Sequence, residues 1–496
     1  MEVCTATTPN SFASRALHLH RFLKRRLVGG LLAPRSETTT TAVAAAAPPS
    51  LELRRIGDDA LAVDVDALAV DVDALLLKPS PSAAFSPYFL VAVEAGGYAR
   101  GLVLLALYPV LRVLSHEARV RAMAMVAFCG LRRDDAARIG RAVLPKHFFR
   151  EAADMHALEA VAALAKEDKV VAAVTRSFPT VMVDAFLTEY VGLKGGPRYL
   201  TGAMEPGESD TKGLGLVLRR TEKKKEEDCV SYPKPMVFHD GRLAFTPTPA
   251  AALAVYVYLP FAVVLAVVRI AIYVLLPWRV SSVVAGLTGV RVRVIGAAPP
   301  AAGGADGGWL YACNHRTLLD PLGIACALRR PVAAVTYSLS RLSEVLSPIP
   351  LRRLTRSREE DRRRMASMLA RGDVVVCPEG TTCREPYLLR FSPLFAELAS
   401  EVTPVAVDAR TDVFYATSTS PVAKSFDSVY FLMNPRPEYS VQFLEPVNTE
   451  SGKSRIEVAN EVQGALAAAL GFEGTALTRK DKYLLLAGNE GVVKTK

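Results

Sequence analysis

Hydrophobic and polar residues are arranged in two different ways along the chain. Residues 86–114 and 250–277 form long apolar segments, whereas beyond residue 285 short apolar runs alternate with polar and charged stretches. Such alternation is typical of an α/β domain. It predicts strands at 290–296, 309–315, 332–338, 374–380, 403–409 and 439–447. The charged stretch 358–371, with its scattered Met and Leu residues, predicts a helix, and a C-terminal helix is expected at 453–470.

The segment 250–277 is the strongest membrane signal. It carries no charge from Ala250 to Val268, which is close to the ~20 apolar residues that a bilayer crossing needs. We expect a membrane span or a re-entrant pair of half-helices rather than the core helix of a soluble domain. Pro260 is expected to kink the helix, and Arg269 is expected to snorkel toward the membrane interface.

The segment 86–114 is apolar but interrupted. Glu94, Arg100 and the Gly96-Gly97 pair lie inside it, and a clean span would not contain two charges. The pattern leaves two interpretations open: an interfacial helix or hairpin that dips into the bilayer, and a buried amphipathic helix.

The first 50 residues show no core pattern. They combine the Arg-rich, acid-free SRALHLHRFLKRRLVGGLLAPR with the low-complexity ETTTTAVAAAAPP. This composition fits a transit peptide, a basic amphipathic helix on a membrane or a tail. No secretory signal peptide is visible in it.

Composition narrows the choice of partners. Half of the 496 residues are hydrophobic and the formal net charge is +10. The mean hydropathy of +0.21 is high for a soluble enzyme and suggests membrane contact. The excess of Lys and Arg suits anionic lipid or phosphorylated substrates, and no nucleic-acid-binding module is recognisable. The seven cysteines form no CxxC pair, which indicates reduced thiols in a cytosolic compartment and no zinc site.

The sharpest chemical signal is NHRTLLD, Asn314 to Asp320, which follows an apolar strand. A histidine at a strand end is accessible for proton transfer, and an Asp five residues later can fold back and hold the imidazole. The pair would be the base and its orienting group, and it needs no protein nucleophile if the substrate brings its own hydroxyl. Taken alone, a His and an Asp at this spacing also fit a structural or solvated role.

Two further motifs suggest binding of a phosphorylated acceptor. In CPEGTTCREP, residues 377–386, Glu379, Gly380 and Thr381 are expected to form a tight turn that binds the acceptor, with Arg384 as a phosphate partner. The stretch PLRRLTRSR, residues 350–358, carries four arginines, which a phosphorylated substrate would explain. A plain turn and a solvated basic loop are the alternatives.

Together these motifs resemble a known series. NHRTLLD, LRRLTR, PEGT and the apolar TPVAV occur in the order of the glycerolipid acyltransferase motifs. From about residue 60 onward, the chain resembles the plant land-lineage glycerol-3-phosphate acyltransferase family, the membrane-bound type with sn-2 preference linked to cutin, suberin and pollen-wall lipids. The resemblance includes KPMVFHDGRLAFTPTP at 234–249 and the tail DKYLLLAGNEGVVKTK. The tail and YSLSRLSE look most similar to the branch involved in anther and tapetum development.

The resemblance implies roles for individual residues. His315 would be the general base, oriented by Asp320, that takes the proton of a glycerol hydroxyl as it attacks the thioester of acyl-CoA. Arg356, with Arg353 as the alternative, would bind the phosphate of glycerol 3-phosphate. Pro404 and its apolar neighbours would support the acyl chain. The remaining positions assigned to substrate binding are Asn314, Glu379, Gly380, Thr381 and Arg384. This chemistry would need no cofactor and no metal.

The family's N-terminal half is similar to haloacid-dehalogenase-type phosphatases, which use DxDx(T/V) at a strand end. The tandem heptad AVDVDAL places Asp71 and Asp73 at the expected position, and Thr175 after VVAAV is the candidate for the second motif. Leu75 stands where Thr or Val is usual, and no third motif with a Lys and an acidic pair is recognisable. We therefore expect a structural scaffold, with Mg²⁺ needed only if this domain is active.

The predicted organisation is an α/β protein in five parts. They are a basic, low-complexity N-terminus at 1–50, a haloacid-dehalogenase-like Rossmann domain at 51–245 with the apolar insertion 86–114, a membrane segment at 250–285, an α/β acyltransferase domain at 286–450, and a C-terminal helix and tail at 451–496. The catalytic halves are expected to face the cytosol at the endoplasmic reticulum membrane, with a mitochondrial membrane as the alternative.

The predicted reaction is acylation of glycerol 3-phosphate by acyl-CoA to lysophosphatidic acid, feeding extracellular lipid synthesis. Three alternatives remain: a bifunctional acyltransferase–phosphatase that releases 2-monoacylglycerol, acylation of lysophosphatidate, and a catalytically silent membrane scaffold. The expected partners are acyl-CoA, glycerol 3-phosphate and membrane lipid, and not nucleic acid.

Overall fold

The computed structural model describes residues 67–71, 84–148, 170–175, 177–190, 236–300, 307–336, 347–355, 357–450 and 452–490. All of them belong to one unit, Ala67–Lys496. The expectations for residues 1–50 lie outside the described residues. Asp73, Arg356 and the segment 191–235 also lie outside them.

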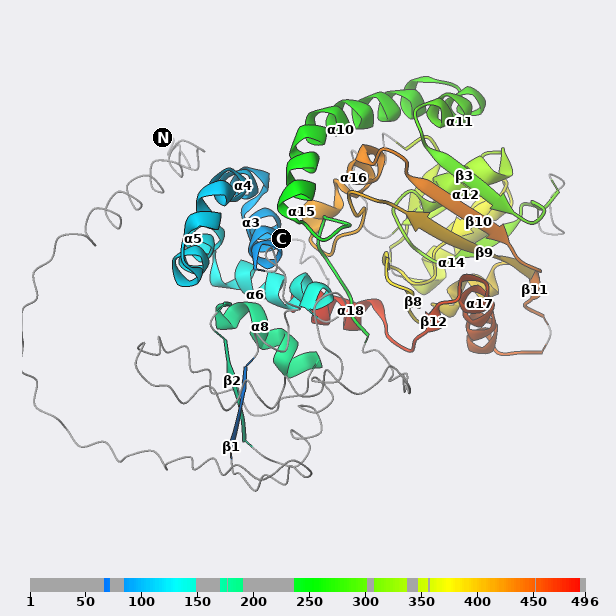
Figure 1. Ribbon diagram of the computed structural model, residues 1–496. Coiled ribbons are helices and arrows are strands. Elements are labelled where there is room, and N and C mark those ends of the chain that lie inside the picture. Colours follow the sequence, from blue (N-terminus) through cyan, green and yellow to red (C-terminus); the bar gives the residue numbers. More distant parts are fainter. Residues whose placement is uncertain are drawn as a thin grey trace, which may run out of the picture. The chain divides into compact units, whose positions relative to one another are not determined.

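An eight-stranded mixed sheet forms the centre of the C-terminal part (Figure 1). Its order is β3-β10-β9-β4-β7-β5-β6, and β11 pairs with β9 outside this path. From β9 through β4, β7 and β5 to β6 the strands run parallel, whereas β10 is antiparallel to β9 and parallel to β3. The strands are β3 Arg291–Ile295, β4 Leu310–Cys313, β5 Ala333–Thr336, β6 Leu351–Arg353, β7 Val374–Val376, β9 Glu401–Arg410, β10 Glu438–Phe443 and β11 Val447–Asn448.

Five of the six predicted strands are confirmed, and the sixth is divided. The segment predicted as one strand at 439–447 forms β10 and the two-residue β11. The start of the arginine-rich stretch, expected to be a loop, forms the edge strand β6. β4 is buried along its whole length, because both faces of a parallel sheet are covered in α/β proteins.

Two layers of helices cover this sheet. On one face, α12 (Asp320–Leu328) lies against β3 and β10. On the other, α14 (Arg358–Leu369) and α17 (Arg455–Leu470) pack with β7 and β9, which confirms both predicted helices. The side chains of β4 alternate accordingly, with Tyr311 and Cys313 in one core cluster and Leu310 and Ala312 in the other.

The segment 86–114 forms two helices, α3 (Phe85–Gly96) and α4 (Tyr98–Val113), which pack on each other. From Phe85 to Val93 α3 is buried, as one of the two interpretations predicts. The half-buried Glu94 accepts hydrogen bonds from the backbone N–H groups of Arg242 and Leu243, at 2.6 and 3.2 Å. This charge therefore ties α3 to a distant segment. The large hydrophobic residues of α4 that are exposed are Leu102, Val103, Leu107, Val110 and Val113.

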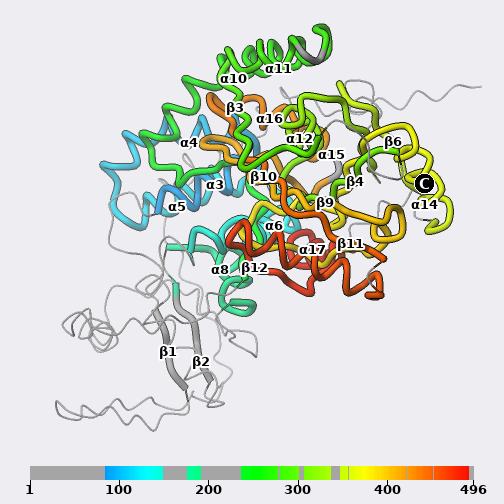
Figure 2. The backbone as a smooth tube through the Cα atoms, turned by 90° about the vertical axis from the view of Figure 1, so that its right-hand side faces the viewer, coloured from blue at the N-terminus to red at the C-terminus, as the bar shows by residue number. Residues whose placement is uncertain are grey.

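The long apolar segment forms one helix, α10 (Pro249–Leu275), which starts with a Thr248 cap and Pro249 in its first turn. The helix continues through Pro260, and Figure 1 shows its axis bending. It is long and apolar enough to cross a membrane, and 22% of its most apolar window is buried. It contacts α4, the short α16 (Asp427–Met433) and α11 (Trp278–Leu287), and Figure 2 shows α10 and α11 in succession.

The expectation that Arg269 snorkels toward the membrane interface is wrong. Its side chain is fully buried instead of extending to an interface. The guanidinium donates to the carbonyls of Leu432 and Asn434, at 2.7 and 2.6 Å, and to those of Thr288 and Pro435, at 2.5 and 3.0 Å. These carbonyls end α16 and α11, so Arg269 fixes α10 to the acyltransferase part of the chain. A guanidinium with five donors can satisfy such a cluster.

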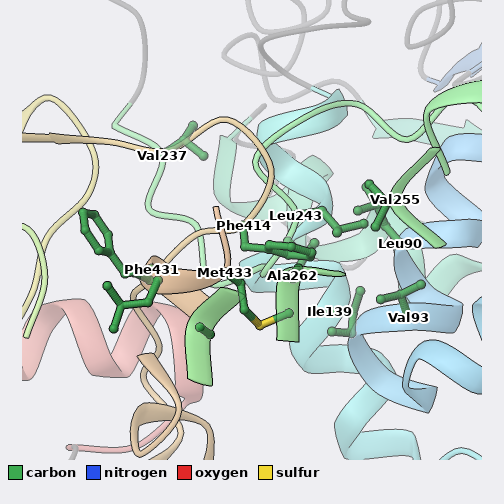
Figure 3. Packing of buried hydrophobic residues seen from close by; sticks show 14 of the residues in the cluster. Leu90, Val93, Ile139, Val237, Leu243, Val255, Ala262, Phe414, Phe431 and Met433 are labelled. Carbon is green, nitrogen blue, oxygen red and sulfur yellow. The ribbon is translucent and has the colours of Figure 1, made fainter. Parts of the chain in front are cut away.

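One continuous core joins the N-terminal helices to the sheet. Leu90 of α3 and Ile139 of α6 belong to the same buried cluster as Val255 of α10 and Phe414 (Figure 3). Leu243 forms an isolated β-bridge with Phe414. The helices of this half not yet named are α5 His116–Phe128, α6 Arg133–Ala142 and α8 Thr180–Ala185, which continues as the π-helix η2 Phe186–Tyr190.

The C-terminal tail adds an element that local pattern did not predict. α18 (Arg479–Ala487) packs against α6. Its capping box uses Thr478 and Asp481. The two-residue strands β12 (Glu473–Gly474) and β8 (Tyr387–Leu388) pair just before it, so the tail is fastened to the segment that follows the PEGT turn.

Candidate active site

His315 and Asp320 meet across the turn that joins β4 to α12. His315 Nδ1 lies 3.0 Å from Asp320 Oδ2. Asp320 is fully buried, and the imidazole is 14% exposed. The carboxylate can accept a hydrogen bond from Nδ1–H, and in the neutral imidazole this leaves the lone pair on Nε2, where a substrate proton could be taken up. The structure thus brings the two predicted residues together in an arrangement that can do base chemistry.

Three further donors hold the Asp320 carboxylate. The backbone N–H of Arg316 donates to Oδ2 at 2.5 Å, and that of Thr317 donates to both oxygens at 2.9 Å. The Thr317 hydroxyl donates to Oδ1 at 3.0 Å and also contacts the Tyr439 hydroxyl. Asp320 is the first residue of α12, where the helix dipole favours a negative charge. The sequence NHRTLLD therefore folds into a compact cradle around its own carboxylate.

The Asn314 side chain is hydrogen-bonded to the main chain of β9 and does not face the solvent. It is fully buried. Its amide donates to the Val407 carbonyl and accepts from the Val407 N–H, both at 2.8 Å. Asn314 thus extends the pairing of β4 with β9 by one side chain and fixes where the strand ends before His315.

Glu379 links the two motifs from within the core. One carboxylate oxygen accepts from the His315 backbone N–H at 2.7 Å and the other from the Leu389 N–H at 3.1 Å. Burial raises the pKa of this carboxyl to about 7. The two N–H hydrogen bonds and the charges of His315 and Lys482 lower the pKa but do not outweigh burial. Sequence reasoning assigned Glu379 to the acceptor, but this residue is 4% exposed and its carboxylate holds the main chain of His315.

The PEGT turn is fastened to the histidine from its other end as well. Gly380 is exposed, with φ of +68°, a conformation that glycine adopts without strain. Thr381 is 3% exposed. The Cys383 N–H donates to the His315 carbonyl at 2.6 Å. His315 is therefore held at its backbone N–H, its backbone carbonyl and its ring.

The charge of His315 depends on a neighbouring thiol. Burial lowers the pKa of the imidazole, but the Cys377 charge and the hydrogen bonds to Asp320 and Cys377 outweigh it and raise the pKa to about 10. Hydrogen bonding from Cys313 and the charge of His315 lower the pKa of the Cys377 thiol to about 6, although burial raises it. His315 and Cys377 therefore titrate as a pair that shares one proton.

Of the predicted phosphate ligands, the structure describes Arg353 and Arg384, and these two lie in different places. Arg353 is exposed at the end of the edge strand β6, whereas Arg356 lies outside the described residues. Arg384 donates to the carbonyls of Gly241 and Thr417, at 2.6 and 3.0 Å, and stacks on Tyr415. Pro404 is buried in β9 opposite Ala312 of β4.

Arg384 also lines a cavity of about 390 Å³ beside the His315 turn, together with Arg316, Thr317, Asp408, Arg410 and Thr417. Arg316 donates to the carbonyls of Cys383 and Glu385, at 2.9 and 2.7 Å. Its Nη2 lies 3.6 Å from Asp408 Oδ1, which makes an ion pair. Within the described residues, neither the Nε of Arg316 nor that of Arg384 has a hydrogen-bond partner. Sequence reasoning missed Arg316, although its place next to His315 could have drawn attention to it.

Lys482 of α18 is a second residue that sequence reasoning missed. It is 4% exposed, donates to the Thr382 carbonyl at 2.7 Å and lies 3.8 Å from Glu385. It therefore fastens the end of the PEGT turn to the C-terminal helix. Only the long-range fold brings residues 100 positions apart into this contact.

The phosphatase-like positions lie on a separate two-stranded sheet. β1 (Ala67–Asp71) and β2 (Val170–Val174) are parallel, with Asp71 opposite Val174. Thr175 follows directly and is buried, and its hydroxyl accepts from the Phe178 N–H at 3.1 Å. Among the described residues, no three His, Cys, Asp or Glu side chains are grouped closely enough to hold a metal ion.

Two family models match the chain. The model of the RAM2-like glycerol-3-phosphate acyltransferase HAD-like domain matches residues 67–202, and the acyltransferase model matches residues 291–414. The His315 turn, the PEGT turn and Pro404 lie within the second match. The protein is thus an O-acyltransferase with an N-terminal HAD-like domain, and the predicted fold class is confirmed.

Named relatives define the family. Glycerol-3-phosphate acyltransferase 1 of Arabidopsis thaliana is 42% identical over 475 residues, which is 83% of this chain and 79% of the relative. Glycerol-3-phosphate acyltransferase RAM2 of Petunia hybrida is 39% identical over 467 residues, which is 83% of this chain and 95% of the relative. The chain belongs to the plant glycerol-3-phosphate acyltransferase family.

Among solved structures, the 1-acyl-sn-glycerophosphate acyltransferase PlsC of Thermotoga maritima resembles 44% of this chain and 90% of that chain, at 14% identity and a TM-score of 0.26. At that TM-score, the similarity supports no structural conclusion.

Proposed function

We propose that this protein transfers an acyl group from acyl-CoA to a hydroxyl of glycerol 3-phosphate and releases lysophosphatidic acid and CoA. The observation that carries the proposal is the His315–Asp320 pair, 3.0 Å apart at the end of β4, inside the matched acyltransferase domain. The relatives are named glycerol-3-phosphate acyltransferases, which supports this acceptor.

The chemistry follows from general base catalysis. His315 Nε2 takes the proton of the glycerol hydroxyl while the hydroxyl oxygen attacks the thioester carbonyl. The carbon–sulfur bond then breaks, and the imidazolium returns the proton to the CoA thiolate. Asp320 keeps Nδ1 protonated and stabilises the imidazolium. No covalent enzyme intermediate, cofactor or metal is required in this scheme.

The shared proton of His315 and Cys377 bears on which form of the base is active. In one arrangement the pair is imidazolium and thiolate, and in the other it is neutral imidazole and thiol, with the same net charge. Only the neutral imidazole can accept a proton from the substrate. The active form is thus the second arrangement, or the pair after the shared proton is lost at high pH.

We propose that the acceptor phosphate binds in the cavity beside Arg316 and Arg384. Arg353 lies on β6, three strands from β4, or roughly 14 Å at the usual strand spacing. A three-carbon acceptor is too short to span that distance with its hydroxyl at His315. The cavity, in contrast, is lined by the residues that directly follow His315, and arginine suits a phosphate through paired hydrogen bonds.

The proposal of a membrane location is based on the exposed surface of α10. Its exposed apolar residues include Val257, Phe261, Val264 and Val267, each more than half exposed, which suits lipid better than water. The endoplasmic reticulum membrane with the catalytic part in the cytosol is the preferred location, because acyl-CoA and glycerol 3-phosphate are found there, and a mitochondrial membrane is the alternative. The sn-2 preference and a role in extracellular lipid synthesis rest on family resemblance.

A second candidate function is removal of the product's phosphate to leave 2-monoacylglycerol. It is favoured by one observation: β1 and β2 place Asp71 and Thr175 at neighbouring strand ends, as the phosphatase-like motifs would require. Loss of phosphate only in the presence of intact Asp71 and Asp73 would support it.

The test is product analysis with membranes that contain the full chain. Acyl-CoA would be supplied with glycerol 3-phosphate or with lysophosphatidate as the acceptor, and products would be identified by mass spectrometry. The proposal expects lysophosphatidic acid from glycerol 3-phosphate as the main product. Exclusive use of lysophosphatidate, or no product with either acceptor, would contradict it.

A further inference from the structure

Two cysteine sulfurs lie in contact beneath the catalytic base. Cys313 Sγ and Cys377 Sγ are 3.5 Å apart. Cys313 is the last residue of β4 and Cys377 follows the last residue of β7, and these strands are parallel neighbours with Ala312 opposite Val376. The register therefore places the two cysteines next to each other at the same edge of the sheet and on the same face.

The two thiols differ in access. Cys313 is fully buried, whereas Cys377 is partly exposed. The charge of His315 also acts on the Cys377 thiol, so Cys377 lies near the residue that the substrate must reach. The other three cysteines in the described part of the chain lie elsewhere: Cys129 after α5, Cys326 in α12 and Cys383 beyond the PEGT turn.

The two thiols also differ in chemistry. The hydrogen bond with Cys313 and the charge of His315 lower the pKa of Cys377 to about 6 against the effect of burial, whereas the hydrogen bond with Cys377, together with burial, raises the pKa of Cys313 well above its usual value. A thiolate is the nucleophilic form of cysteine and the form that peroxides oxidise. Cys377 therefore has the properties of the thiol that reacts with a peroxide, and Cys313 those of the resolving thiol that then forms the disulfide with it.

We propose that Cys377 and Cys313 form a reversible disulfide when a hydroperoxide oxidises Cys377. The Cys377 thiolate attacks the peroxide, takes one oxygen to become a sulfenic acid and, with a proton, releases an alcohol or water. The Cys313 thiol then attacks the Cys377 sulfur, the sulfur–oxygen bond breaks and water leaves. The two thiols lose two electrons and two protons, and the peroxide gains them. A dithiol reverses the bond by exchange.

The geometry permits the bond with a small movement. A disulfide needs its sulfurs at ~2.05 Å, so they must approach by about 1.5 Å. Neighbouring strands are spaced ~4.8 Å apart, which lies within the Cα separations that disulfides bridge. The new bond would also connect the strand ends that carry NHRTLLD and PEGT, the two turns that hold the His315 main chain. We therefore expect oxidation to displace the His315 imidazole from its working position and to reduce acyl transfer.

The test is disulfide mapping on the full chain in membranes. The membranes are treated with hydrogen peroxide, and the remaining free thiols are then blocked before digestion. The proposal expects a Cys313–Cys377 cross-linked peptide that dithiothreitol removes. In Cys313→Ser the cross-link is absent and the sulfenic acid at Cys377 reacts with dimedone. Cys326→Ser is the matched control and should cross-link like wild type. If Cys313→Ser fails to fold, Cys313→Ala serves the same purpose.

The disulfide mapping does not depend on acyl transfer. A failure of the disulfide proposal can therefore be told apart from a failure of the proposed acyltransferase function. Where acyl transfer is present, peroxide is expected to reduce it about ten-fold or more, as part of a general-base contribution of ~10²–10⁴ is lost, and dithiothreitol is expected to restore it. Oxidation of Cys377 to a sulfinic acid with no cross-linked peptide would overturn the inference. So would equal dimedone labelling in wild type and Cys313→Ser.

Discussion

The imidazole of His315 and the carboxylate of Asp320 are joined at 3.0 Å within a turn whose backbone N–H groups and Thr317 hydroxyl also donate to that carboxylate. Asp320→Asn would place a donating NH₂ group among these donors. We expect kcat to fall by about 10²–10⁴, as when a base loses its orienting group, with little change in the KM of acyl-CoA. Rates of CoA release test this.

The control for that variant is Asp135→Asn, an exposed acid in the first turn of α6. It should retain wild-type kcat. If Asp320→Asn kept more than half of the wild-type kcat, the assignment of Asp320 as the orienting residue would be refuted.

Cys377 is expected to shift the pH dependence of the reaction. Because the thiolate helps to raise the pKa of His315 to about 10, part of the activity should appear only as the pH rises toward that value. In Cys377→Ser the charge is gone, so the pKa falls and the plateau of kcat/KM should be reached at lower pH. Profiles of both proteins, corrected for spontaneous thioester hydrolysis, would be compared. Superimposable profiles would show that the thiol does not influence the base.

Glu379→Gln is expected to reduce both stability and activity. The carboxylate accepts two backbone N–H groups, but an amide offers only one acceptor oxygen and sets its NH₂ against the other donor. A lost buried hydrogen bond costs about 1–3 kcal/mol, which should appear as a lower midpoint in thermal unfolding. Glu401→Gln, at the exposed start of β9, should behave like wild type. An unchanged midpoint in Glu379→Gln would argue against the role of Glu379 in holding His315.

The site of the acceptor phosphate can be assigned from KM values. Arg384→Gln is expected to raise the KM of glycerol 3-phosphate about ten-fold or more, since a hydrogen bond to a charged group is worth roughly 1.5–3 kcal/mol. The KM of acyl-CoA should not change. Arg353→Gln on the exposed end of β6 should have a small effect. The opposite pattern would move the phosphate from the cavity to β6.

The exposed face of α10 should determine membrane binding. Val264 on α10 and Ile456 on α17 are 63% and 64% exposed, respectively, so a lysine fits either position without steric cost. Val264→Lys should weaken membrane association, because charge in an apolar lipid environment is costly, whereas Ile456→Lys should not. Flotation with liposomes measures this. Equal flotation of both variants would contradict the assignment of α10 to lipid.

Local pattern predicted much of the C-terminal fold. The apolar runs that became β4, β7 and β9 are strong signals because parallel strands are buried on both faces. The pairing of His315 with Asp320 was also predictable, since both residues lie within one turn of chain. Motif order identified the family before any contact was known.

Contacts between distant segments were not predictable from local pattern. Arg269 and Glu94 look like interruptions of apolar segments, but each satisfies backbone groups more than 145 positions away. Glu379 was assigned to the acceptor, and its partners could be seen only after β4 and β7 were paired. The contact between Cys313 and Cys377 depends on the same register. In each case the deciding information is which strands or helices become neighbours.

The most direct test of the central claim compares wild type with His315→Ala in membranes supplied with acyl-CoA and radiolabelled glycerol 3-phosphate. The account predicts that wild type incorporates label into lysophosphatidic acid and that His315→Ala, present at the same level and with the same thermal unfolding midpoint, loses about 10²-fold or more of this rate. Incorporation by His315→Ala at the wild-type rate would show that His315 is not the base.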